Sequence, residues 1–150
     1  MDIISFLLGL LLIINYQLAL AFIGASYNFK DTIIPSLILA IAAYFSKIVF
    51  AAPPIIHTTI LVIITVVLIH YLNKISLILS AVGSLLSFIT LVVGSLLLVC
   101  PCLLKMGLEI PLETSGFQWI ILNLAEFFVP LLTLLIFKIF KITPIYKLIN

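Results

Sequence analysis

Residues 117–137 read FQWIILNLAEFFVPLLTLLIF, an apolar stretch with one carboxylate, Glu126, near its middle. As an α-helix, this stretch spans about 31 Å at ~1.5 Å per residue, close to the thickness of a bilayer's hydrocarbon core. Glu126 would then lie near the bilayer midplane, where an ionisable group is costly unless it faces protein or water. The stretch predicts a membrane-spanning helix that carries a candidate functional residue.

The composition of the whole chain is typical of a membrane protein. Of its 150 residues, 65% are hydrophobic and 8% are charged, and the mean hydropathy is +1.50. Soluble domains average about 45–50% apolar and about 25% charged residues. The apolar runs are continuous rather than alternating, which argues against a transmembrane β-barrel. We therefore expect an all-α, polytopic membrane protein that folds as a single transmembrane domain over residues 1–150.

Five apolar segments, separated by polar or proline-containing turns, predict a bundle of five transmembrane helices. Thr32 or Asp31 is expected to cap the second helix, with Pro35 in its first turn. Ser76 is expected to cap the fourth helix. The expected helices cover residues 3–24, 33–51, 55–72, 77–99 and 117–137, and an interfacial tail follows at 138–150.

The fourth expected helix carries small residues at spacings of three and four. Small residues on one face let helix backbones approach closely, which is the packing pattern of membrane helices. We expect this helix to be the central packing element of the bundle, and a homodimer contact through the same face is the alternative. The helix-packing residues are Gly83, Ser84, Ser87 and Gly94.

The distribution of lysine predicts the orientation in the membrane. The chain has seven Lys and no Arg, and with five spans Lys47 and Lys105 fall on one side and the other five on the opposite side. The side rich in lysine is usually cytoplasmic. We expect the N-terminus outside and the C-terminus inside a cell membrane. The N-terminal segment has no basic residue ahead of its apolar run, so a cleaved signal peptide is not expected.

Polar residues inside the expected spans are the candidates for function. Glu126 shares a helix face with Asn123 and Pro130, and Pro130 leaves the Glu126 carbonyl without its usual helical N–H partner. Lys47 is the candidate charged partner because it enters from the same outer half, and Asn15 of the first helix is the candidate neutral partner. Two interpretations stay open: a protonated Glu126 that only joins helices, and a proton- or ligand-responsive site.

Histidine and cysteine offer little chemistry. His57, a further polar intramembrane candidate, lies about 20 Å along its helix from His70, so the two cannot share a metal ion. Cys100-Pro101-Cys102, expected to end the fourth helix, is similar to a metal site in copper-transporting ATPases, but no ATPase domain accompanies it. Cys100 and Cys102 are the candidate metal ligands, and we expect no metal and no other cofactor.

The sequence carries none of the common catalytic motifs of hydrolases, nucleotide-binding enzymes or zinc peptidases. The cysteines and His70 fall at opposite ends of the expected bundle, so no nucleophile and base are paired. We therefore do not expect an enzyme. The net charge of +2 is too small to indicate nucleic-acid binding.

The order of features resembles the N-terminal multi-pass membrane domain of Bacillota sensor histidine kinases, including peptide-sensing quorum receptors with a GHKL-type ATPase domain. The resemblance rests on Lys47 near a helix end, the segment Pro53-Pro54-Ile55-Ile56-His57-Thr58 opening the next helix, Lys74-Ile75-Ser76 before the small-residue helix, and a lysine-rich exit from the last helix. It implies a sensory or regulatory membrane module. Because no kinase domain follows, it also implies signalling through a membrane or cytoplasmic partner.

Two other functions remain open besides the sensory one. A small transporter or ion-pathway subunit is the first, because transport sites are often built at locally broken polar helices. A structural or assembly subunit of a membrane complex is the second. The lipid bilayer is the partner that the composition itself predicts.

Overall fold

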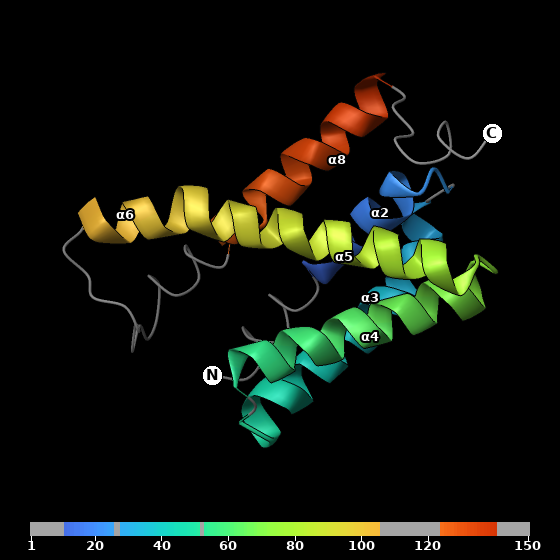
Figure 1. Ribbon diagram of the computed structural model, residues 1–150, viewed down its shortest axis with the longest axis horizontal. Helices are drawn as coiled ribbons and strands as arrows, with labels where there is room; N and C mark the ends of the chain where they lie inside the picture. The colour runs from blue at the N-terminus through green and yellow to red at the C-terminus, as the bar shows by residue number, and fades with distance from the viewer. Residues whose placement is uncertain (1–10, 26–27, 52, 106–123, 141–150) are drawn as a thin grey trace.

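The computed structural model describes residues 11–25, 28–51, 53–105 and 124–140. Within these ranges every regular element is a helix, which confirms the all-α prediction (Figure 1). Two of the elements, η1 and η2, are single wide turns of π-helix. The elements are α2 (Leu12–Phe22), α3 (Phe29–Tyr44), η1 (Phe45–Val49), α4 (Pro54–Leu72), α5 (Leu77–Gly94), η2 (Ser95–Val99), α6 (Cys100–Lys105) and α8 (Phe128–Phe140).

Among the described residues, three helices are long and apolar enough to cross a membrane, namely Phe29–Lys47, Ile55–Asn73 and Leu77–Leu98. Large apolar side chains on their outer faces are exposed, among them Ile55 and Ile78. An extensive apolar surface is unfavourable in water and suits contact with lipid. The prediction of a helical membrane protein is supported to this extent.

The four expected packing residues of α5 are all buried against neighbouring helices. A Cβ atom on Gly83 would lie 2.6 Å from the Ala19 carbonyl oxygen of α2. A Cβ atom on Gly94 would lie 2.8 Å from the Glu126 carbonyl oxygen, just before α8. Since real Cβ contacts are longer than this, only glycine permits these two approaches. α5 also packs against α4, so it contacts three helices, as expected of a central element (Figure 1).

Of the described helices, however, the most covered is α2 rather than α5. Seven of its eleven residues are buried, because α3, α5 and α8 all pack on it. α5 keeps one face open, where Leu85 and Ile89 are exposed. Its small-residue face is occupied by α2 and α8, so a contact between two copies of the chain would need a different face.

The second expected helix begins earlier than its capping pattern indicated. α3 starts at Phe29 after Asn28, so Thr32 lies inside the helix and Pro35 lies in its second turn. The Thr32 hydroxyl does not cap the helix; it accepts a hydrogen bond of 2.8 Å from Gln17 Nε2 of α2. The Thr32 side-chain oxygen, which was expected to cap α3, therefore bonds a residue of another helix instead.

The fourth expected helix does not end at Cys100-Pro101-Cys102. α5, η2 and α6 follow one another without a break from Leu77 to Lys105 (Figure 1). Pro101 has no N–H to donate to the preceding turn. The helix continues past Pro101 because the preceding turn, η2, is a wide π-helical turn. This turn closes with a hydrogen bond from the Cys100 N–H to the Ser95 carbonyl oxygen. The N-terminal cap is as predicted, since the Leu79 N–H donates to Ser76 Oγ at 3.4 Å.

The last expected helix is described only from residue 124. Residues 124–126 are helical, Phe127 forms a turn, and α8 then continues to Phe140. The break fits Pro130, which cannot donate to the Glu126 carbonyl. The expected segments 3–10, 117–123 and 141–150 lie outside the described residues.

Candidate functional site

Glu126 sits in the short helical turn before α8, partly buried beside η2. Ser95 Oγ donates to its Oε1 at 3.3 Å. Lys47, in η1, is close enough for its positive charge to act on the Glu126 carboxyl. The carboxyl therefore accepts one hydrogen bond from a neutral donor in η2, and the charge of one exposed cation in η1 acts on it.

His57, in the first turn of α4, belongs to the same group. Its Nδ1 lies 2.6 Å from Ser46 Oγ of η1, and Ser46 is buried. The charge of Lys47 also acts on the His57 ring. Glu126, Ser95, Lys47, Ser46 and His57 are called the Glu126 cluster below.

Both π-helical turns contribute to this cluster. Ser46 and Lys47 lie in η1, and Ser95 lies in η2. π-Helical turns are rare and occur often at functional sites, because the extra residue in the turn redirects side chains that an α-helix would place elsewhere. The polar residues of the cluster are thus presented by the two irregular turns of helices that are otherwise regular.

The crossing of α5 and the α8 segment sets the geometry around Glu126. At Gly94 an added Cβ would also lie 3.2 Å from Val129 Cβ, besides its contact with the Glu126 carbonyl oxygen. That carbonyl is the one left without a helical partner by Pro130. Glycine therefore allows the broken part of the last helix to lie directly on α5, one residue before Ser95.

Three of the residues predicted for the site come together: Glu126, Lys47 and His57. Asn15, the expected neutral partner of Glu126, does not bond it through its side-chain carbonyl. Its Oδ1 is buried in α2 without a hydrogen-bond partner among the described residues. Asn123 lies outside the described residues. Ser95 was missed, although it follows Gly94 directly, because a serine in a membrane helix usually bonds its own backbone.

Ser46 was missed for the same reason. It does donate to its own backbone, with the Ala43 carbonyl oxygen 3.2 Å away, and it meets His57 as well. Its position beside Lys47 was the available signal. Neither serine differs in type or spacing from the many serines that only pack helices.

The cysteines gain no support as metal ligands. Cys100 is a free, partly buried thiol in α6. Positions 100 and 102 are two residues apart on a helix, and such positions do not face each other. Across the described ranges, no group of three or more His, Cys, Asp or Glu residues could hold a metal ion.

The opposite end of the bundle has polar contacts of a different kind. The Tyr16 hydroxyl donates to Asn73 Oδ1 at 2.7 Å, which ties α2 to the turn between α4 and α5. Gln17 donates to Thr32 and ties α2 to α3. These are neutral hydrogen bonds between helices, and they suit packing rather than chemistry.

The chain was compared with protein-family models, with curated proteins and with solved structures, and none of the three comparisons finds a match. The similarity to sensor-kinase membrane domains therefore stays a resemblance. What the Glu126 cluster does must be inferred from its own chemistry.

Proposed function

We propose that this chain is a five-span protein of the cell membrane that acts as a sensory or regulatory module through a partner. The N-terminus lies outside and the C-terminus in the cytoplasm. Three helices of spanning length and the lysine distribution support this arrangement. α2 and the helix containing Glu126 and α8 provide the other two spans.

The observation that carries the proposal is the Glu126 cluster. A carboxyl, an ammonium and an imidazole come from the turn before α8, from η1 and from α4. Charges in a membrane interior interact strongly because the local dielectric constant is low. A change in the charge of one member therefore alters the attraction between three helices. The cluster can convert proton or ligand binding into a change of helix packing.

The break at Phe127 gives this change a route toward a partner. α8 is separated from Glu126 by a turn, and it ends near the lysine-rich exit of the chain. A helix joined through such a break can change direction without unfolding. Movement of α8 would then be detected by a membrane or cytoplasmic partner.

The same break favours an ion pathway as the second candidate. Transport sites often combine a polar residue with an interrupted helix. An assembly subunit, in which the cluster only joins helices, is the third. The three functions predict different consequences when Glu126 can no longer ionise.

The test is Glu126→Gln in a background lacking both cysteines, reconstituted in nanodiscs. Spin labels at Tyr71 and Ile139, both exposed on helices that flank the core, report the distance between α4 and α8. The wild-type distance should change between mildly acidic and mildly alkaline buffer, and Glu126→Gln should abolish much of that change. Asp31→Asn, which neutralises an exposed carboxylate on α3, is the matched control and should keep the response.

Other outcomes support the alternatives. If Glu126→Gln folds and keeps the full response, the cluster only joins helices and the sensory proposal fails. If the protein conducts protons in liposomes and Glu126→Gln stops the flux, the ion pathway replaces it.

A further inference from the structure

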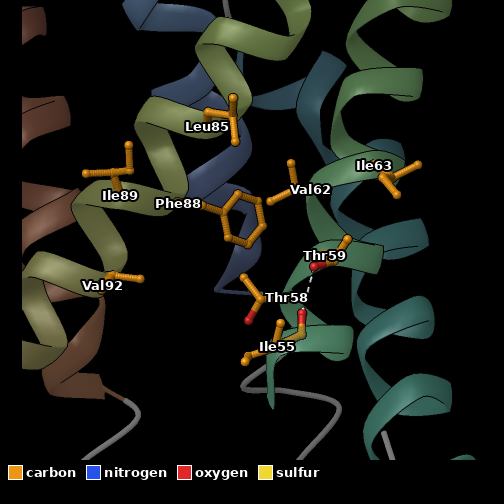
Figure 2. A pocket seen from close by; sticks show the side chains of 9 residues that line it. All are labelled: Ile55, Thr58, Thr59, Val62, Ile63, Leu85, Phe88, Ile89 and Val92. Carbon is orange, nitrogen blue, oxygen red and sulfur yellow. Dashed lines mark hydrogen bonds between the residues drawn. The ribbon is translucent and has the colours of Figure 1, made fainter. Parts of the chain in front are cut away.

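An apolar groove opens sideways between α4 and α5 (Figure 2). Its volume is about 570 Å³, within the range of about 300–1,000 Å³ common for small-molecule sites. The first half of α4 and the second half of α5 form its walls, with Thr58, Val62 and Ile63 on one side and Leu85, Phe88 and Ile89 on the other.

The groove exists because α4 and α5 diverge from the turn that joins them (Figure 1). Phe88 fills the space between them and is 5% exposed, whereas Ile63 and Ile89, at 56% and 55%, remain open to the outside. The hydroxyl of Thr59 donates to the Ile55 carbonyl at 2.8 Å, so the polar atom of this lining residue is already used (Figure 2). The groove therefore presents branched apolar surface.

The lining chemistry does not suit a further helix. Helices associate in membranes where Gly, Ala, Ser or Thr lets the backbones approach. Of the described residues that line the groove, only Thr58 and Thr59 are of this kind, and both lie on α4; the α5 wall consists of Leu85, Phe88, Ile89 and Val92. The glycines of α5 face α2 and the α8 segment instead. A flexible hydrocarbon chain, in contrast, can follow an irregular surface of branched side chains.

The position of the groove indicates where such a chain would come from. Both walls belong to helices long and apolar enough to span a membrane. The groove is continuous with the exposed apolar faces of those helices, which carry Val67 on α4 and Leu96 on η2, the continuation of α5. Its open side therefore faces the hydrocarbon of the surrounding bilayer.

We propose that the groove between α4 and α5 binds one acyl chain of a phospholipid from the bilayer, and that this lipid is the ligand of the module. Thr58 on one wall is adjacent to His57, and Val92 on the other wall is three residues before Ser95. A chain held between the walls separates α4 from α5 and so moves His57 relative to Ser95 and Glu126. This coupling rests on the proposed sensory function, whereas the lipid site does not.

Photolabelling of the full chain tests the site directly. The protein is placed in nanodiscs of phosphatidylethanolamine and phosphatidylglycerol, with a small fraction of phosphatidylglycerol that carries a diazirine within one acyl chain. After illumination, mass spectrometry should find label concentrated on Val62, Phe88 and Ile89, well above Ile34, which is 66% exposed on α3. Equal labelling of all exposed faces would reduce the contact to ordinary bulk lipid and overturn the proposal.

A variant that fills the groove gives a second test. Ile89→Trp should lower labelling of Val62 about tenfold, the change that ~1.4 kcal/mol of binding free energy produces. Ile34→Trp, an equally large change on an exposed face of α3, should leave it unchanged. Leu85→Trp serves if Ile89→Trp does not fold. Undiminished labelling of Val62 in a folded variant contradicts the proposal.

Further measurements distinguish which molecule occupies the groove from whether the groove is coupled to the Glu126 cluster. An Ile89→Cys variant that forms a disulfide dimer in membranes would show that a second copy, not a lipid, fills the groove. If labelling is specific but Ile89→Trp leaves the pH-dependent distance between Tyr71 and Ile139 unchanged, the lipid is not the ligand of the module. If Glu126→Gln still abolishes that response while no specific labelling is found, only the lipid site fails.

Discussion

At the scale of single residues, Gly94 determines whether the Glu126 cluster can form. It lets the Glu126 carbonyl lie against α5, and the next residue, Ser95, then reaches the carboxyl. Ser84, about three turns earlier on the same helix, is also buried, but its hydroxyl has no hydrogen-bond partner among the described residues. Two small residues on the same face of α5 thus contribute very differently to the contacts between helices.

This difference predicts opposite outcomes for two alanine substitutions. Gly94→Ala should lower the free energy of unfolding by about 1–3 kcal/mol, because the new methyl group must push the α8 segment away from α5. Ser84→Ala should raise it slightly, by up to about 1 kcal/mol, because no hydrogen bond is lost and a buried hydroxyl without a partner is removed. Unfolding in detergent micelles, followed by circular dichroism, measures both. Equal stability of the two variants would contradict the assigned role of Gly94.

The hydrogen bond from Ser95 to Glu126 can be measured by a double-mutant cycle. Ser95→Ala and Glu126→Met remove the donor and the acceptor separately and together, since Met has the length of Glu but no oxygen to accept the bond. Hydrogen bonds between membrane helices contribute about 0.6–2 kcal/mol, and we expect a coupling energy in that range. Strict additivity of the two substitutions would show that Ser95 does not hold the carboxyl. Thr90→Ala, whose hydroxyl bonds only its own helix backbone, is the control and should not couple to Glu126.

At the scale of the elements, irregular turns carry the polar chemistry and regular helices carry the packing. η1, η2 and the turn at Phe127 all lie beside the Glu126 cluster. The regular stretch of α5 contributes Gly83 and Ser87 to the contacts between helices. Local departures from α-helix thus occur where titratable groups meet.

The turn at Phe127 is expected to depend on Pro130. Pro130→Ala supplies an N–H for the Glu126 carbonyl, so the helix should continue through Phe127 and α8 should change direction. The spin-label distance between Tyr71 and Ile139 should shift even at constant pH. Pro35→Ala, which replaces a proline inside α3 away from the Glu126 cluster, should leave that distance unchanged. An unaltered distance in Pro130→Ala would mean that packing, not the proline, imposes the break.

At the scale of the whole molecule, neutral side chains bond helices at one end of the bundle, and the Glu126 cluster lies toward the other end. Tyr16 bonds Asn73 at the turn between α4 and α5, and the groove opens where the two helices diverge from that turn. Lys47, His57 and Glu126 lie toward the open end. The groove and the Glu126 cluster therefore lie toward the same end of the bundle.

The proposed orientation is tested by cysteine labelling in intact cells, with both native cysteines replaced. Phe50→Cys, at an exposed position directly after η1 on the proposed outer side, should react with an impermeant thiol reagent. Lys141→Cys, expected on the cytoplasmic side from the lysine distribution, should react only after the cells are permeabilised. Reaction of Lys141→Cys in intact cells would reverse the orientation.

The sequence by itself determined the properties that depend on local composition and spacing. Continuous apolar runs predicted helices because only helices and closed β-barrels satisfy the backbone within a bilayer, and barrel strands alternate apolar and polar residues. The spacing of Gly83 and Gly94 predicted close packing, Ser76 predicted a cap, and Pro130 left the Glu126 carbonyl without its helical partner. In the structure, neighbouring backbone lies close to Gly83 and Gly94, Ser76 caps α5, and the helix is interrupted at Phe127.

Only the tertiary structure decided which groups meet. It put Ser95 rather than Asn15 on the Glu126 carboxyl, and it surrounded α2 more fully than α5. It also carried the helix past Pro101 through a π-helical turn. These outcomes depend on how each helix is rotated and where it crosses its neighbours. Successive side chains of an α-helix point about 100° apart, so a small rotation of the helix changes which residues face its neighbours. In an apolar helix several faces can pack equally well, and the choice is made only when all the helices are placed together.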